Sequence, residues 1–253
     1  PVCAQQNMVP NGDFEDYTTC PTAFSQTMNC TGWYSYHGGT SDYFNACASS
    51  VNVGVPTNYF GSQYAAHGNA YTGCYTWGGS SVNYKEYVSR VITAMTPGCA
   101  YDVSMSITLA NISGNASDDI GVYFFKNGPA TLSSPSSCLS VTPQISYASY
   151  GAITDKYNWT RVSASFVADS AYDHIVIGGF KDINNISVTP VSGGSNIFAY
   201  YYFDSIVVRL IKIRFTYPDT LLCAGDTFSL PYTVDTSFHG GTGNQLRVQL
   251  SNA

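Results

Sequence analysis

Alternating apolar and polar residues are the main regularity of this chain, and they predict β-strands. Within residues 101–110, the odd-numbered positions from Val103 to Leu109 are apolar and the even-numbered positions between them are polar. Side chains of a strand point alternately to its two faces, so this segment predicts a strand with one face in a core. The same pattern predicts further strands over 120–125, 159–168 and 175–180.

A longer apolar run, 197–211, mixes aromatic and β-branched residues and predicts a strand buried on much of both faces. No segment has a convincing 3.6-residue period, so no helix is expected. Connectors rich in Ser, Gly and Pro, such as 128–137 and 188–195, separate the predicted strands. The predicted fold class is all-β.

The pattern changes near Lys212, after which short strand-like segments follow at 213–217, 227–234 and 245–250. An immunoglobulin-like domain needs about seven strands over roughly 100 residues, so this C-terminal sandwich is incomplete. Either the chain belongs to a larger protein, or a second chain supplies the missing strands by edge addition. The second case predicts a homo-oligomer or fibre.

Composition narrows the class of protein. The chain has 253 residues, of which 10% are charged and 15% aromatic, and its formal net charge is −6. Low charge with abundant Tyr is typical of a secreted β protein and not of a coiled coil. The chain has no run of basic residues, so it lacks the positive charge with which proteins bind a nucleic-acid backbone. Without a run of about 18 apolar residues no membrane insertion is expected.

Eight cysteines are present without any Cys-x-x-Cys pair, which argues against zinc and thioredoxin-type sites. We predict disulfides, with Cys20 joined to Cys30 or Cys47, and therefore a secreted protein. Buried free thiols are the alternative. Six cysteines are the disulfide candidates: Cys20, Cys30, Cys47, Cys74, Cys99 and Cys138.

The first residues, 1–5, are interpreted as the remnant of a signal peptide or as an N-terminal tail. Ala4 is a small residue directly before a polar stretch, as at a signal cleavage point. The folded part of the chain is therefore expected to begin at residue 6.

The run Asn7–Glu15, the pair Gly32–Trp33 and the segment Tyr201–Val208 stand in a fixed order along the chain. In this order they resemble galactose-binding-like jelly rolls, a superfamily that includes many carbohydrate-binding modules. The resemblance spans residues 6–211 and implies a jelly-roll β-sandwich whose first and last strands lie close together. Residues 212–253 would then begin an immunoglobulin-like domain.

Segments 39–47, 53–56 and 68–71 look like the N-terminal domains of large secreted surface adhesins of gliding and marine Bacteroidota. Parts of the tail between 222 and 251 look like the immunoglobulin-like repeats of those adhesins. This resemblance implies an extracellular, cell-surface location, the type IX secretion route, and a role in adhesion or assembly.

The galactose-binding-like resemblance also implies a structural Ca²⁺ near the two ends of the jelly roll. Hard cations prefer carboxylate and carbonyl oxygens, and we predict Glu15 and Asp204 as ligands, with Asp13 as a third. On an extended segment 11–15, Asp13 and Glu15 would share one face while Phe14 points into the core. The alternative is that Asp13 caps a turn and Asp204 is a hydrogen-bonded strand carboxylate.

A carbohydrate site needs an exposed aromatic face with polar groups nearby, because sugar rings stack on aromatic faces and their hydroxyls need directed hydrogen bonds. Trp33 is predicted in the core, and packing is the alternative for every other aromatic residue. The candidates for the site are Trp77, Tyr75, Tyr34, Tyr36 and His37.

No catalytic residue is predicted, because the histidines are scattered and neither a nucleophile elbow nor a His-Glu-x-x-His motif occurs. The leading hypothesis is a non-enzymatic extracellular surface adhesin or filament subunit domain. The alternative is a carbohydrate-binding module that recognises a polysaccharide through surface aromatics. Asp-Ser/Thr-apolar patterns occur along the chain, and the two in expected turns make Ser170 and Thr220 candidates for O-glycosylation.

Overall fold

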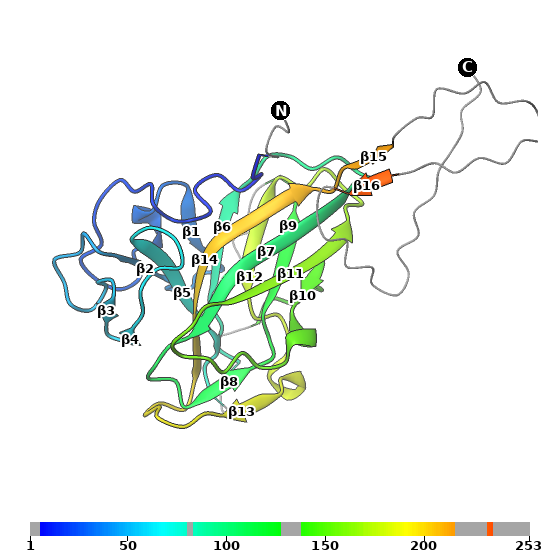
Figure 1. Ribbon diagram of the computed structural model, residues 1–253. Coiled ribbons are helices and arrows are strands. Elements are labelled where there is room, and N and C mark those ends of the chain that lie inside the picture. Colours follow the sequence, from blue (N-terminus) through cyan, green and yellow to red (C-terminus); the bar gives the residue numbers. More distant parts are fainter. Residues whose placement is uncertain (1–5, 80–82, 128–137, 216–231, 235–253) are drawn as a thin grey trace, which may run out of the picture. The chain divides into compact units, whose positions relative to one another are not determined.

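The computed structural model describes residues 6–79, 83–127, 138–215 and 232–234 (Figure 1). The chain divides into two compact units, Pro1–Leu210 and Ile211–Ala253. Within the described residues all regular structure is β-strand or one-turn 3₁₀-helix, which confirms the all-β prediction. The 3₁₀-helices are η1 (Thr27–Asn29), η2 (Ala148–Tyr150) and η3 (Ile183–Asn185).

Two five-stranded antiparallel sheets form the first unit (Figure 1). The strands of sheet I, in spatial order, are β1 (Trp33–Tyr36), β6 (Tyr87–Val91), β12 (His174–Gly178), β9 (Gly121–Phe125) and β10 (Ile145–Ser146). The strands of sheet II are β11 (Thr160–Val167), β7 (Ala100–Leu109), β14 (Ala199–Leu210), β5 (Ala70–Trp77) and β2 (Asp42–Asn45). Two short pairs accompany them: β3 (Thr57–Asn58) with β4 (Gly61–Ser62), and β8 (Asn115–Ser117) with β13 (Val188–Pro190).

The main core lies between the facing sides of the two sheets. Trp33 and Ile175 contribute to it from sheet I, and Ile107 and Phe203 from sheet II, all almost fully buried. Antiparallel sheets packed face to face around one apolar layer make this unit a jelly-roll β-sandwich, as predicted.

The strands predicted from alternation and from the long apolar run are confirmed: β7, β9, β11, β12 and β14 begin and end within two residues of the expected bounds. The polar face of β7 is more buried than predicted, because β7 is a central strand whose outer face is covered. Arg161 Nη2 donates to Ser104 Oγ at 2.7 Å, and Thr108 Oγ1 donates to the carbonyl of Asp155 at 3.0 Å. Buried polar side chains therefore keep hydrogen-bond partners there.

The N-terminal segment lies beside the last strand, as the resemblance implies. Asn7 bridges the two: its Oδ1 accepts from Val208 N at 2.9 Å, and its Nδ2 donates to Ile206 O at 2.8 Å. The segment 11–15 is a turn and not the extended stretch predicted, since Asn11 and Phe14 have φ of 47° and 62°. Phe14 is nevertheless fully buried.

Asn11 explains why the first two motifs of the resemblance occur together. Its carbonyl accepts from Trp33 Nε1 at 2.8 Å, while its amide Nδ2 donates to Asp16 O at 2.8 Å and Thr31 O at 3.1 Å. The ring of Phe14 packs on Trp33 with centroids 4.7 Å apart. One asparagine thus ties the N-terminal turn to the start of β1.

Cys20 and Cys47 form a disulfide with Cα atoms 5.7 Å apart, one of the two pairings predicted. The prediction of further disulfides is corrected: Cys30, Cys74, Cys99 and Cys138 are free thiols. Cys30 shows the reason, because its Sγ lies 3.7 Å from the carbonyl oxygen of Phe14 and 3.6 Å from that of Asp16. Burial raises the pKa of Cys30 to about 12, so this thiol stays a neutral core side chain.

Of the second unit the structure describes the antiparallel pair β15 (Ile213–Phe215) and β16 (Tyr232–Val234). Most of the predicted immunoglobulin-like region, 212–253, lies outside the described residues, as do the predicted tail 1–5 and Thr220. The immunoglobulin-like assignment stays a prediction. No helix among the described elements is long and apolar enough to span a membrane.

Candidate functional site

Aromatic side chains gather on the outer face of sheet I, the face turned away from the main core. Tyr34 and Tyr36 of β1 point there because Trp33 points inward, and successive strand residues alternate. Tyr123 and Phe125 of β9 lie on the same side. We call Tyr34, Tyr36, Tyr123 and Phe125 the aromatic face.

The sheet register brings these rings together over a floor of small residues. Ser89 and Val176, both fully buried, lie between Tyr34 and Tyr123 in one row across the sheet. The rings of Tyr123 and Phe125 are stacked with centroids 6.1 Å apart and an interplanar angle of 13°. The outer face therefore carries aromatic rings on both sides of a narrow polar and aliphatic strip.

Tyrosine hydroxyls converge on this face. Tyr36 is buried, and its pKa is raised by burial and by the neighbouring hydroxyls of Tyr34 and Tyr123. The Tyr34 hydroxyl is itself buried and has no hydrogen-bond partner among the described residues. A buried hydroxyl without a partner is costly, so a water or ligand hydroxyl that bonded to this group would stabilise it.

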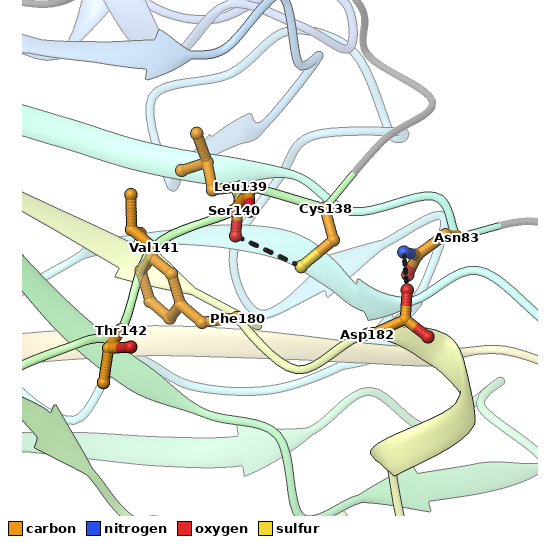
Figure 2. A pocket seen from close by; sticks show the side chains of 8 residues that line it. All are labelled: Asn83, Cys138, Leu139, Ser140, Val141, Thr142, Phe180 and Asp182. Atoms are coloured by element: carbon orange, nitrogen blue, oxygen red, sulfur yellow. Dashed lines mark hydrogen bonds between the residues drawn. The ribbon is translucent and has the colours of Figure 1, made fainter.

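A cavity of about 340 Å³ adjoins the aromatic face. Figure 2 shows the side chains that line it. Phe180 connects the two, since its ring centroid lies 6.4 Å from that of Tyr123 and 5.3 Å from that of Tyr87. The cavity combines one aromatic ring, aliphatic side chains, hydroxyls, an amide and a carboxylate. Its lining residues are Asn83, Cys138, Leu139, Ser140, Val141, Thr142, Phe180 and Asp182.

Asn83 supplies an acceptor at the wall of this cavity. Its Nδ2 donates to Asp182 Oδ2 at 3.1 Å, and its Oδ1 is buried without a partner among the described residues (Figure 2). Asp182 is fixed in turn, because its Oδ1 accepts from the backbone N of Asn184 at 3.1 Å and caps η3. The Asn83–Asp182 pair thus presents oxygens that suit a ligand hydroxyl.

Cys138 closes one side of the cavity without reactive chemistry. Its Sγ lies 3.4 Å from the carbonyl oxygen of Lys181, and burial raises the thiol pKa. Leu139 N donates to the Tyr87 hydroxyl at 3.0 Å, and that hydroxyl donates to Gly179 O at 2.6 Å. The Cys138 thiol is neutral and therefore a poor nucleophile, and the hydrogen bonds to Tyr87 hold the backbone of this wall in place.

The predicted carbohydrate residues separate into two groups. Tyr34 and Tyr36 belong to the aromatic face, and His37 is buried next to it with its ring centroid 6.2 Å from that of Tyr87. Trp77 and Tyr75 lie on β5 in sheet II, apart from this site.

Trp77 is not an exposed platform, which corrects the prediction for this residue. Only 8% of its surface is exposed, and it belongs to the main core. The register of β5 and β14 shifts between Ala199 and Tyr200, and such a bulge re-aims the following side chain. Tyr75, before the shift, stays on the outer side and packs edge-on against Phe198 at 4.8 Å.

The three predicted calcium ligands contact one loop, residues 66–70. Asp204 Oδ2 accepts from Ala66 N at 2.7 Å and from His67 N at 3.0 Å. Glu15 Oε1 accepts from the backbone N of residues 69 and 70 at 2.8 and 2.9 Å. Asp13 Oδ2 lies 3.3 Å from His67 Nδ1. The carboxylates therefore act as acceptors for one loop.

Backbone N–H groups point at Asp204 Oδ2 and Glu15 Oε1, two of the oxygens that a cation would use. Burial raises the pKa of Asp204 to about 7, while its backbone N–H partners act in the opposite direction. Within the described part of the chain no group of three or more His, Cys, Asp or Glu side chains is placed to hold a metal ion. The calcium site stays a prediction.

Sequence reasoning proposed Tyr34 and Tyr36 but missed the rest of the site, including Tyr123, Phe125, Asn83 and Asp182. Tyr123 and Phe125 lie in the predicted strand 120–125, and their alternation with smaller residues was the available signal. Asn83 and Asp182 have no such signal, because they meet only through the fold, 99 positions apart. Ser170, an O-glycosylation candidate, lies half-buried in a bend after β11.

No protein-family model matches the chain, and no curated protein matches its sequence. Solved structures do resemble it. The CBM22-1 xylan-binding domain of Xyn10C from Paenibacillus barcinonensis is 10% identical, with a TM-score of 0.41, over 82% of this chain and 96% of that domain.

Two further similar structures are an adhesin domain and an enzymatically active domain. The K2 cleaved adhesin domain of Lys-gingipain is 9% identical, with a TM-score of 0.40, over 79% of this chain and 95% of that one. The enzymatically active domain of tailspike protein 4 from bacteriophage CBA120 is 12% identical, with a TM-score of 0.38, over 81% of this chain and 21% of that one. Similarity at this level concerns the fold alone and assigns neither ligand nor activity.

Proposed function

We propose that this domain binds a neutral glycan through the aromatic face and the adjoining cavity, and that it serves extracellular attachment. One observation carries the proposal: two buried polar atoms, the Tyr34 hydroxyl and Asn83 Oδ1, lack partners among the described residues on a surface of aromatic rings. Sugars supply hydroxyls for such atoms and apolar ring faces for the aromatics.

The lining of the cavity favours an uncharged ligand. Asp182 is the only charged residue among the described lining residues, and its carboxylate would repel a sugar acid. The volume of about 340 Å³ lies near the lower end of the range of small-molecule sites, about 300–1,000 Å³. A single sugar unit in the cavity, with the chain continuing over the aromatic face, matches these dimensions.

The same lining supports binding and not hydrolysis. Most glycoside hydrolases use a pair of carboxyl groups flanking the scissile bond. Asp182 is the one carboxylate among the described lining residues, and its two oxygens already accept hydrogen bonds from Asn83 and Asn184. That the protein is not an enzyme stays a prediction.

Extracellular attachment unites the two sequence-based hypotheses, the surface adhesin and the carbohydrate-binding module. The Cys20–Cys47 disulfide supports an oxidising, extracellular-type environment. A domain that holds a glycan without cleaving it performs adhesion. The Bacteroidota origin and the type IX secretion route stay predictions.

Binding to an array of neutral and acidic oligosaccharides tests the proposal, followed by calorimetric titration of the best neutral ligand. Asn83→Ala and Tyr123→Ala are expected to weaken binding at least about ten-fold, which corresponds to about 1.4 kcal/mol. Tyr157→Ala is the matched control, since Tyr157 is 78% exposed and contributes to neither the face nor the cavity. Absence of any glycan ligand, or equal binding by all variants, would contradict the proposal.

A further inference from the structure

A lysine and an aspartate meet inside the protein at one end of sheet I. Lys85 lies two residues before β6, and Asp119 lies two residues before β9. β12 separates these two strands, and Tyr87, Gly178 and Gly121 form one row across the three. Lys85 Nζ donates to Asp119 Oδ2, and the two side chains are only 1% and 4% exposed. The pair therefore bridges β6 and β9 past the end of β12.

Fixed backbone groups hold the amine and the carboxyl group against each other. Lys85 Nζ also donates to Thr76 O, in β5, at 2.9 Å. Asp119 Oδ1 accepts from Phe180 N at 2.8 Å and from Lys181 N at 3.0 Å. Lys181 N also donates to Asp119 Oδ2 at 3.1 Å. Because these backbone groups belong to the sheets or to the segment directly after β12, the pair is kept in one orientation.

Gly179 makes the close approach of the pair possible. A Cβ added at this position would lie within 3.0 Å of three atoms: Asp119 Oδ2, Thr76 O and Lys85 Nζ. A larger residue would therefore push between the amine and the carboxyl group. The backbone at Gly179 closes one side of the pair, and glycine leaves the nitrogen and the carboxyl group in contact.

A buried ammonium and a buried carboxylate are costly, because both have lost the water that solvates them. Condensation to an amide removes both charges and releases one water molecule. Groups held in a reactive orientation within one molecule behave as if present at about 10⁵–10⁸ M. We propose that Lys85 and Asp119 form an intramolecular isopeptide bond between Lys85 Nζ and Asp119 Cγ.

The reaction needs no co-reactant. Lys85 Nζ passes one proton to Asp119 Oδ2, which leaves a neutral amine and a neutral carboxyl group. The nitrogen then attacks Asp119 Cγ, and the bond between Cγ and Oδ2 breaks. The Oδ2 hydroxyl takes a second proton from the nitrogen and leaves as water, and the third proton stays on the amide. The N–H groups of Phe180 and Lys181 stabilise the negative charge that develops on Oδ1 during the attack.

The bond would join two strands that have no hydrogen bonds to each other. Lys85 and Asp119 are 34 positions apart, and β12 lies between β6 and β9. The cross-link would restrict the unfolded chain in the way that a disulfide does, and reductant would not break it. This inference is independent of the proposed glycan site.

Intact mass spectrometry of the full chain, with all cysteines reduced, tests the proposal. We expect the wild type to be one water molecule lighter than its sequence mass. A tryptic digest of the denatured protein should contain a branched peptide that joins residues 85 and 119. Lys85→Arg keeps the positive charge and the hydrogen-bond donors but removes the amine, so its mass should equal its sequence mass.

Lys181→Arg is the matched control. Lys181 Nζ lies 2.7 Å from Asp118 Oδ2, but the Lys181 side chain is 30% exposed, so water can solvate these charges and the pair is expected to remain ionic. This variant should still be one water molecule lighter than its sequence mass. Its branched peptide should be the same as that of the wild type.

A wild type at its full sequence mass would overturn the proposal, and this outcome does not depend on the folding of any variant. A loss of water that persists in Lys85→Arg would also overturn it, because the dehydration would then lie elsewhere in the chain. A branched peptide that joins Lys181 to Asp118 would contradict the assignment to the buried pair. None of these readouts involves a glycan, so the isopeptide bond and the proposed function can fail separately.

Discussion

Single carboxylates fix the loop 66–70 in this domain. Glu15 accepts two backbone N–H groups from the loop, and Asp204 accepts two more. Hydrogen bonds to a charged acceptor contribute about 1.5–3 kcal/mol each to stability. Glu15 of the N-terminal segment and Asp204 of the last strand both bind the loop 66–70. This loop therefore links the first and last segments of the sandwich.

Calcium is expected to leave thermal stability unchanged, because these carboxylates already accept hydrogen bonds from the loop. Melting curves of the domain in calcium and in EDTA should coincide. Glu15→Gln, which loses a charged acceptor, should lower the melting temperature equally in both buffers. A rise with calcium that Asp204→Asn abolishes would restore the predicted metal site.

Gly68→Ala should be destabilising in the same loop. Gly68 has φ of +68°, and an added Cβ would lie 2.2 Å from the carboxyl carbon of Glu15. The substitution combines left-handed strain with displacement of the Glu15 carboxylate, so a loss of about 2–4 kcal/mol is expected. Gly98→Ala is the control, since Gly98 has φ of +81° and no atom within 4 Å of the added Cβ. Equal losses in the two variants would mean that backbone strain alone is responsible.

Asp42 should make stability depend on pH. Burial raises its pKa from 3.8 to about 7 in the folded protein. The folded chain therefore retains a proton that the unfolded chain releases, and the free energy of unfolding falls as pH rises from about 4 to 7.

Asp42→Asn removes this titration and keeps an acceptor for Ser25 N. Thermal melts across that pH range should show the wild type losing several degrees relative to the variant as pH rises. Parallel pH profiles for the two proteins would show that Asp42 does not hold the proton.

At the scale of elements, strand positions were predictable and face assignments were only partly so. Alternation located β7 and β9, because period two is a local property of the chain. It did not show that the outer side of β9, with Tyr123 and Phe125, packs partly buried against a separate apolar cluster. The prediction that Trp77 is exposed was wrong for a different reason. The bulge that turns Trp77 inward depends on how β5 and β14 pair, and no residue near Trp77 in the sequence indicates it.

The disulfide should matter most to the element that it staples. Cys20 and Cys47 are 27 positions apart, and closing a loop of that length restricts the unfolded chain by about 3–4 kcal/mol. Reduction, or the double substitution Cys20→Ser and Cys47→Ser, should lower the melting temperature by roughly ten degrees. Cys30→Ser removes a free thiol and leaves the disulfide intact. Reductant should therefore lower the melting temperature of this variant as much as that of the wild type. A reduced wild type with unchanged stability would contradict this role.

At the scale of the molecule, the two sheets use their outer faces differently. Phe60 stacks on Tyr200 at the outer face of sheet II, whereas the outer face of sheet I carries the aromatic face and adjoins the cavity. Sequence reasoning could place Tyr34 and Tyr36 as candidates because they follow the Gly32–Trp33 motif. It could not join them to Asn83 and Asp182, which only the packing of the strands brings near.

The central claim is that sugar hydroxyls complete the hydrogen bonding of two buried polar atoms. A crystal structure of the domain with the neutral oligosaccharide selected on the array tests this most directly. We expect sugar hydroxyls within about 3.2 Å of both the Tyr34 hydroxyl and Asn83 Oδ1, with a sugar ring against Phe180 or Tyr123. An oligosaccharide bound elsewhere, with the aromatic face and the cavity empty, would contradict the claim.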